Sequence, residues 1–127
     1  MKLQCGRFSF DLEKPLVMGV VNITPDSFSE RAPFLDPDAA VAHARRLAEE
    51  GADLVDIGGE STRPGAAPVS EEEELERILP VLRSLSDLAV SVDTRRPKVM
   101  REVLAAGASM INDVDALAAP GALEAVA

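Results

Sequence analysis

The chain has 127 residues, of which 46% are hydrophobic and 28% charged, and its formal net charge is −9. This length predicts one domain, and the composition is typical of a globular protein. The acidic excess argues against a nucleic-acid partner, because that kind of binding needs clustered Lys and Arg side chains. No apolar run approaches the ~18 residues of a membrane span, and the N-terminus does not resemble a signal peptide. The single cysteine, Cys5, excludes an internal disulfide, so we expect a cytoplasmic protein with no membrane partner.

The first elements are a short hairpin or edge strand within residues 1–14 and then a buried strand. The strand is predicted over Leu16–Val21, an apolar run that stops at a carboxamide. A helix follows, because Asp36 can accept a bond from a free N–H group and Pro37 suits the first helical position. Gly51 is expected to end this helix.

The second helix is predicted over residues 70–85. Ser70 and Glu73 form a capping-box pattern, in which each side chain accepts from the backbone N–H of the other residue. The acidic run Glu71–Glu74 is expected to be a solvated helix start rather than a metal site. Pro80, inside the helix, is expected to kink it.

The remaining pattern alternates between strand and helix. Strands are predicted over residues 52–59, 89–93 and 109–113, and helices over residues 96–107 and 121–127. The chain therefore contains about four βα units with parallel strands, which suits either an open doubly wound sheet or a (β/α)8 barrel.

Polar residues at the strand ends favour the barrel, because a barrel gathers the ends of many strands around one mouth. The residues in question are Asn22, Asp56, Asp93 and Asn112. A complete barrel needs ~250 residues. We therefore expect residues 1–127 to be the N-terminal half of an α/β, TIM-barrel-type domain, with the hairpin of residues 1–14 before the βα units of residues 15–127.

The Gly/Pro-rich loop over residues 58–68 is a candidate anion site. Thr62 offers a hydroxyl group, and Arg63 offers a fork of donors that suits phosphate. The loop matches neither a Walker nor a Rossmann pattern, so a flexible loop with a surface arginine is an open alternative.

Asp93 and Asn112 are candidates for reading the edge of a flat heterocycle. A carboxylate at the end of a buried strand is costly without a partner, and a carboxamide is both a donor and an acceptor. Each residue could instead cap the loop that follows it. Asp56 has to be hydrogen-bonded if it points into the barrel. The sequence contains no His/Cys cluster with zinc spacing.

Three stretches together resemble the dihydropteroate synthase family: "MGVVNITPDSFS", "GADLVDIGGESTRPGA" and "SVDTRRP" followed by "GASMINDV". The resemblance implies a (β/α)8 barrel that joins 6-hydroxymethyl-7,8-dihydropterin diphosphate to p-aminobenzoate, giving 7,8-dihydropteroate and pyrophosphate. It also implies assistance by Mg²⁺, inhibition by sulfonamides that imitate aminobenzoate, and a homodimeric full-length protein.

The resemblance also implies roles for individual residues. Asn22 is the implied Mg²⁺ ligand, and Asn22, Arg63 and Asp93 are the implied catalytic residues. The residues implied for the pterin and its diphosphate are Asp56, Thr62, Arg63, Asp93 and Asn112. The residues implied for the aminobenzoate site and its loop are Thr24, Asp26, Ser27, Phe28 and Pro64.

Two other functions stay open at this stage. One is a pterin-binding methyltransferase domain of corrinoid-dependent enzymes, which has no diphosphate leaving group, so "TPDSF" and "STRPG" count against it. The other is a non-catalytic fragment that binds pterin weakly or not at all. We expect residues 1–127 alone to be inactive, because half a barrel leaves sheet edges and an apolar interior uncovered.

Overall fold

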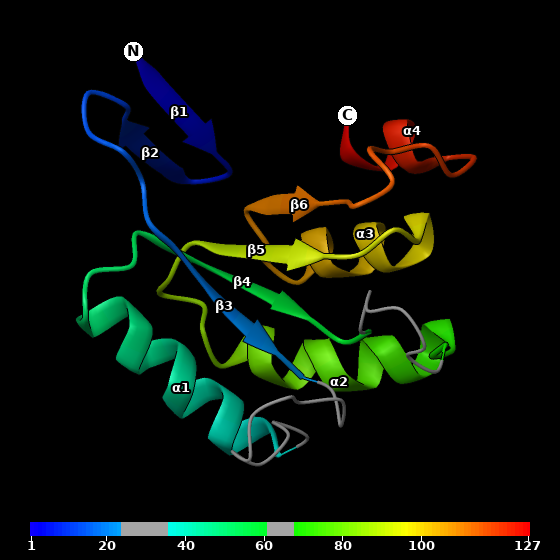
Figure 1. Cartoon of the computed structure of the whole chain (residues 1–127). Helices are drawn as coiled ribbons and strands as arrows, with labels where there is room; N and C mark the ends of the chain where they lie inside the picture. The colour runs from blue at the N-terminus through cyan, green and yellow to red at the C-terminus, as the bar shows by residue number, and fades with distance from the viewer. Residues whose placement is uncertain (24–35, 61–67) are drawn as a thin grey trace.

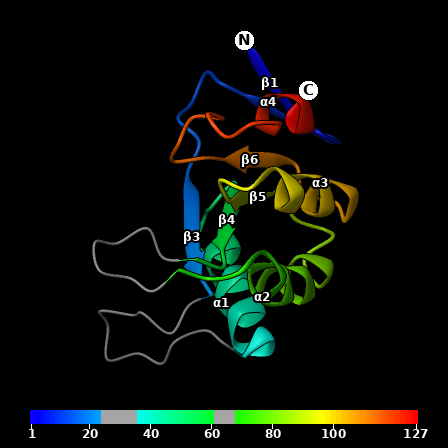
Figure 2. The same cartoon turned by 90° about the vertical axis from the view of Figure 1, so that its right-hand side faces the viewer.

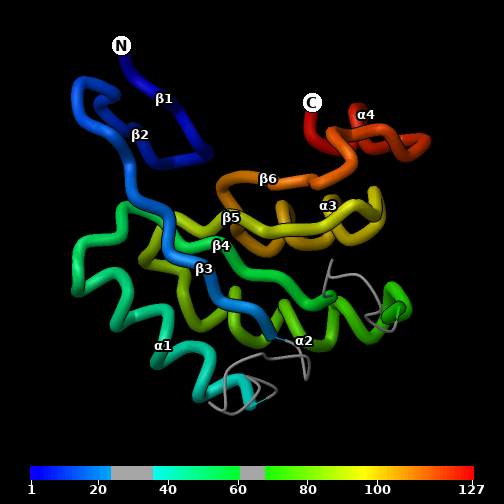
Figure 3. The backbone as a smooth tube through the Cα atoms, viewed as in Figure 1, coloured from blue at the N-terminus to red at the C-terminus, as the bar shows by residue number. Residues whose placement is uncertain are grey.

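The computed structural model describes residues 1–23, 36–60 and 68–127 (Figure 1). The chain begins with a hairpin of two antiparallel strands, β1 (Lys2–Cys5) and β2 (Phe8–Asp11). This confirms the predicted hairpin, whose two strands form a sheet of their own beside the main sheet (Figure 3). Within the described ranges, no helix is long and apolar enough to cross a membrane.

The main sheet has four parallel strands whose spatial order follows their order in the chain. The strands are β3 (Met18–Asn22), β4 (Leu54–Gly58), β5 (Val90–Asp93) and β6 (Met110–Asn112). The helices are α1 (Pro37–Glu49), α2 (Glu71–Arg83), α3 (Pro97–Ala105) and α4 (Ala122–Val126). Figure 2 shows α1, α2 and α3 on one side of the sheet. A sequential order with helices on one face has no switch point, so the sheet is part of a (β/α)8-type barrel and not a doubly wound sheet.

The predicted helix starts are confirmed, with one correction. Asp36 accepts from the N–H of Asp38 at 3.0 Å, and Ser70 Oγ accepts from the N–H of Glu73 at 3.1 Å. The predicted second bond of the capping box, from the Ser70 N–H to the Glu73 carboxylate, is wrong. The Glu73 carboxylate instead accepts from Arg77 at 2.8 Å. An ion pair one turn along the helix has replaced the second cap bond.

The core lies between the sheet and the helices. Alternate strand residues such as Val55 and Val92 point toward the helices, where Ile78 of α2 and Val103 of α3 meet them. The core cluster contains only Val, Ile, Leu and Ala side chains. This agrees with a sequence in which only 3% of residues are aromatic.

The expectation of a buried strand over Leu16–Val21 holds for one face of β3 and is wrong for the other. Val21 is 1% exposed, but Met18 and Val20 of the same strand are 38% and 54% exposed. Val20 and Val21 point to opposite faces, because side chains alternate along a strand. The helices cover the Val21 face, and no described residue covers the Val20 face to the same extent.

Gly19 lets β3 approach α1 closely. A Cβ atom at this position would lie 2.9 Å from Leu47 Cδ1 and 3.0 Å from Leu47 Cβ. Gly19→Ala is therefore expected to lower the free energy of unfolding by about 1 kcal/mol through overpacking. Urea unfolding in the wild-type and Leu47→Ala backgrounds measures this, since the smaller side chain at residue 47 should remove most of the cost. An equal cost in both backgrounds would contradict the explanation.

Candidate active site

Three of the predicted site residues lie in one register position across the sheet. Asn22 pairs with Gly58, Gly58 with Asp93, and Asp93 with Asn112. We call these four residues the strand-end row. Paired residues of neighbouring strands point to the same face, and here that is the face away from the helices. Asn22, Asp93 and Asn112 therefore lie side by side at the C-terminal edge of the sheet, where barrel enzymes place their sites.

Gly58, and not Asp56, is the member of the row that β4 contributes. The expectation that Asp56 ends its strand is wrong, because β4 continues for two more residues. A Cβ atom at Gly58 would lie 3.4 Å from Asp93 Cβ and 3.8 Å from Asp93 Oδ2. The missing side chain thus leaves open space beside the Asp93 carboxylate.

Asp56 lies one layer deeper, on the same face, and its residue is only 4% exposed. Its Oδ2 accepts a long hydrogen bond of 3.4 Å from Asn112 Nδ2. Neither Asp56 Oδ1 nor the buried Ser91 Oγ has a hydrogen-bond partner among the described residues. Burial raises the pKa of Asp56, against the opposing effects of the nearby Ser91 and Asn112 side chains. Asp56 therefore orients the Asn112 amide and keeps one acceptor free.

Asp93 is a half-buried carboxylate, and no hydrogen bond joins its side chain to another part of the described chain. The backbone N–H of Thr94 donates to the Asn112 carbonyl at 3.0 Å, and that of Arg96 donates to Thr94 Oγ1 at 3.2 Å. Neither of these N–H groups donates to the Asp93 carboxylate. They therefore give no support to the alternative that Asp93 caps the loop after β5.

The electrostatic environment disfavours ionisation of Asp93. Burial raises the pKa of Asp93 to about 6, and the negative charges of Asp56, Glu74 and Asp113 add to this effect. A carboxylate in such a place is stabilised by a ligand that brings hydrogen-bond donors or positive charge.

Asn112 does not cap the loop after β6, because the next residue does so. Asp113 Oδ1 accepts from the N–H of Asp115 at 2.8 Å, and Asp113 Oδ2 accepts from the N–H of Leu117 at 2.9 Å. The Asn112 side chain is left with Asp56 as its hydrogen-bond partner in the described structure. Its amide oxygen is therefore available to a ligand.

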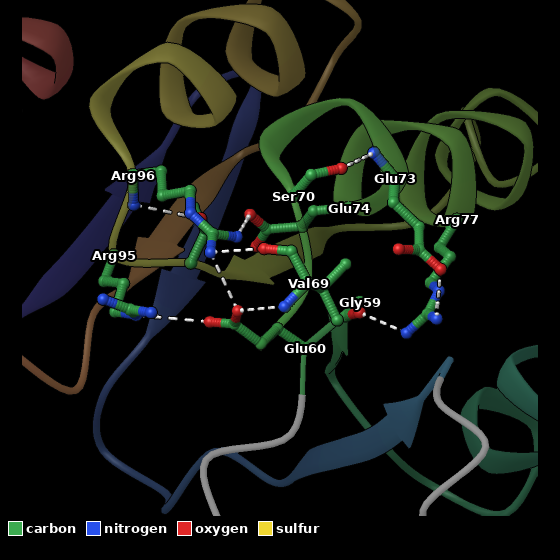
Figure 4. A network of polar contacts seen from close by, with 10 residues as sticks. Gly59, Glu60, Val69, Ser70, Glu73, Glu74, Arg77, Arg95 and Arg96 are labelled. Carbon is green, nitrogen blue, oxygen red and sulfur yellow. Dashed lines mark hydrogen bonds and ion pairs between the residues drawn. The ribbon is translucent and has the colours of Figure 1, made fainter. Parts of the chain in front are cut away.

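A largely buried ion-pair cluster, which the sequence pattern did not predict, lies just beyond the ends of β4 and β5 (Figure 4). Arg96 Nη1 donates to Glu74 Oε1 at 2.9 Å, and Arg96 Nη2 donates to Glu60 Oε2 at 2.9 Å. Glu60 also accepts from the N–H of Val69 at 3.0 Å and from Arg95 Nε at 3.2 Å. We call Glu60, Glu74 and Arg96 the carboxylate–arginine cluster.

The expectation of a solvated acidic run is wrong for Glu74, whose residue is 1% exposed. Glu74 precedes the buried Ile78 by four residues and so lies on the same face of α2. That spacing is the signal that could have identified it. No comparable signal pairs Glu60 with Arg96, which is 36 residues away along the chain.

The two carboxylates of the cluster respond differently to their surroundings. Burial acts to raise the pKa of Glu60, but the Val69 N–H bond and the Arg96 charge outweigh it, so the pKa falls below its ordinary value. For Glu74, burial outweighs the hydrogen bonds, and the pKa rises. The surroundings therefore favour the ionised form of Glu60 and disfavour that of Glu74.

Seven of the predicted site residues lie outside the described residues and stay predictions. They are Thr24, Asp26, Ser27, Phe28, Thr62, Arg63 and Pro64.

Asn22 is the described residue that could contact a metal ion. Its exposed side chain lies at the end of β3, with a carboxamide oxygen of the hard type that Mg²⁺ prefers. No group of three or more His, Cys, Asp or Glu side chains in the described ranges could hold a metal. Asn22 thus fits Mg²⁺ only as one ligand beside water and ligand phosphates, which is a common arrangement for this ion.

Comparisons with known proteins agree on one family. The sequence profile of the family described as "Pterin binding enzyme" matches residues 18–127. The Escherichia coli (strain K12) dihydropteroate synthase is 49% identical over 130 residues, covering 100% of this chain and 46% of the relative.

Two solved structures are also similar. The Xanthomonas albilineans dihydropteroate synthase with 4-aminobenzoic acid is 58% identical with a TM-score of 0.90, over 99% of this chain and 47% of that one. The Burkholderia cenocepacia dihydropteroate synthase complexed with 7,8-dihydropteroate is 50% identical with a TM-score of 0.86, over 98% of this chain and 42% of that one. The chain therefore spans about half the length of the relatives that it matches.

Proposed function

Because this chain belongs to the family of pterin-binding enzymes, we propose that it forms half of the active site of a dihydropteroate synthase. The proposed reaction is a transfer in folate biosynthesis, with 6-hydroxymethyl-7,8-dihydropterin diphosphate and p-aminobenzoate as substrates. The solved relatives support this, because one holds 4-aminobenzoic acid and another holds 7,8-dihydropteroate.

The observation that carries the proposal is the strand-end row. Asp93 provides an acceptor without a partner among the described residues, and Asn112 provides a carboxamide oriented by Asp56. A pterin presents ring N–H and amino donors along one edge, together with ring acceptors. The row offers the complementary groups side by side, at the edge of the sheet where ligands of barrel enzymes bind.

In the proposed mechanism, the bond between the pterin methylene carbon and the diphosphate oxygen breaks first. Pyrophosphate leaves with the electron pair, and the ionised Asp93 stabilises the positive character that develops on the pterin. The amine nitrogen of p-aminobenzoate then bonds to the methylene carbon and loses a proton to solvent. No protein nucleophile is required.

The diphosphate end of the substrate is assigned to other groups. Thr62 and Arg63 are proposed to bind the diphosphate, while Thr24, Asp26, Ser27, Phe28 and Pro64 are proposed to form the aminobenzoate side. A magnesium ion, when bound, would neutralise negative charge on the leaving pyrophosphate, with Asn22 as its protein ligand. We further propose that the full-length protein is a sulfonamide-sensitive, cytoplasmic homodimer.

A chimera tests the proposed function. Residues 1–127 replace the matching segment of the E. coli relative, and dihydropteroate formation is measured with Mg²⁺, beside the unmodified E. coli enzyme as control. We expect turnover within about tenfold of the control. A chimera that folds cooperatively and binds no pterin would contradict the proposal.

The 127-residue chain alone is a second test, and it is expected to show no turnover. Its residues lack whatever the other half of the relatives contributes to the site. Robust formation of dihydropteroate by the chain itself would show that the site is complete within these residues.

A further inference from the structure

Arg96 joins three segments that are far apart in the sequence. It follows β5 by three residues, so its position is tied to the strand end that carries Asp93. Its guanidinium contacts Glu60 and the backbone carbonyl of Val69, and on its other side it contacts Glu74 of α2. Glu60 and Val69 are also joined to each other by a hydrogen bond.

Glu60 and Val69 stand before and after residues 61–67 in the chain. We propose that Arg96 is a positioning residue, which fixes two points of the chain relative to Asp93: Glu60, just after β4, and Val69, just before α2. The assignment of this role to diphosphate binding rests on the proposed function, because the intervening residues include Thr62 and Arg63.

The geometry requires an arginine. One terminal nitrogen of the guanidinium donates to Glu74, and the other donates to both Glu60 and the Val69 carbonyl. A planar fork can hold these acceptors at once, whereas a lysine ammonium is a point charge without this fixed spread. The side chains of Arg96, Glu60 and Glu74 are 17%, 10% and 2% exposed, so water replaces few of these bonds.

The cluster is not needed merely to fill space. A buried ion pair is often no more stabilising than well-packed apolar side chains of similar volume. What the charged contacts add is direction, because each of them fixes one backbone segment at one distance from the guanidinium. Arg77 reinforces the same region by donating to the Gly59 carbonyl at 2.9 Å.

Arg45 provides a matched control. Like Arg96 it makes three hydrogen bonds, but two of them go to the single carboxylate of Asp87 and the third goes to the Ser84 carbonyl. Its contacts join α1 to the residues just after α2, and none of them involves the strand-end row.

Amide hydrogen exchange tests the positioning role in the 127-residue chain. Arg96→Met and Arg96→Lys are expected to speed exchange of the Val69 amide at least tenfold, with core amides such as that of Val92 less affected. Arg45→Met should leave the Val69 amide unchanged. If Arg96→Met does not fold, the lysine variant decides. An unchanged Val69 exchange rate in a folded Arg96 variant would overturn the proposal.

Ligand binding to the chimera tests the link to the diphosphate. Arg96→Lys is expected to weaken binding of the pterin diphosphate at least tenfold and to change binding of the unphosphorylated 6-hydroxymethylpterin less than twofold. Equal weakening of both ligands would overturn the link. If the unmodified chimera binds neither ligand, the proposed function fails, and the Val69 exchange rate still decides the role of Arg96.

Discussion

Asp93→Asn is expected to weaken pterin binding to the chimera by about 100-fold, which is the scale of losing one partner of a desolvated, charge-assisted contact. The substitution keeps the size of the side chain and places a donor where a ligand donor needs an acceptor. Titration calorimetry with 6-hydroxymethylpterin measures the effect. Asp115→Asn, an exposed acidic residue in the loop after β6, is the matched control and should bind normally.

The pH dependence gives this prediction a second readout. The pKa of Asp93 is raised to about 6, so the ionised acceptor forms as the pH rises through that value. Pterin binding by the wild-type site should strengthen between pH 5 and pH 7, while the Asp93→Asn variant should show a flat profile over this range. Binding within threefold of wild type in the variant would contradict the role of Asp93.

The raised pKa of Asp93 also predicts that Asp93→Asn weakens pterin binding without destabilising the fold. A raised pKa in the folded state means that the protonated carboxyl is favoured there, and this contribution to stability is lost as the pH rises from about 4 to about 6. An asparagine side chain is not ionisable, so the variant does not lose this stability at neutral pH. The variant should therefore be at least as stable as wild type at pH 7 in urea unfolding.

Glu60→Gln is expected to lower the free energy of unfolding by about 3 kcal/mol at pH 7, as when one member of a buried ion pair is removed. Glu60 accepts from the Val69 N–H, from Arg96 and from Arg95, and an amide cannot replace all three acceptor contacts. Glu74→Gln is the matched variant. It should cost less, about 1 kcal/mol, because burial already disfavours the ionised form of Glu74.

The two variants should also differ in their response to acid. The pKa of Glu60 is lowered in the folded state, so its contribution is present above its unfolded value of about 4.5 and is lost as the pH falls below it. Glu74 has a raised pKa, so its effect has the opposite sign. Unfolding free energies between pH 3 and pH 7 should therefore fall less steeply with acid in Glu60→Gln than in Glu74→Gln. Identical profiles would show that the cluster does not shift the pKa values of the two carboxyl groups in opposite directions.

The positions of residues that directly follow a predicted strand could be predicted from the sequence. Asn22, Asp93 and Asn112 follow apolar runs directly, and parallel strands bring such ends to one edge, so their meeting in the strand-end row could be predicted. Asp56 was grouped with the strand ends although the strand was predicted over residues 52–59. In the structure Gly58 belongs to β4, and the two-residue period then puts Asp56 one layer deeper.

The features that were not predicted from the sequence depend on which faces of the strands and helices pack together. Val20 is exposed and Val21 is buried although both belong to one apolar run, because only one face of β3 meets a helix. The Glu60–Arg96 pair joins residues that no periodic pattern relates. Such contacts follow from the order of the strands and become predictable only once that order is known.

The strand-end row is proposed to bind the pterin ring. A crystal structure of the chimera with 7,8-dihydropteroate tests it most directly. We expect the pterin edge to lie within hydrogen-bond distance of the Asp93 carboxylate and the Asn112 side chain, on the sheet face away from the helices. A pterin bound elsewhere, with neither side chain in contact, would contradict it.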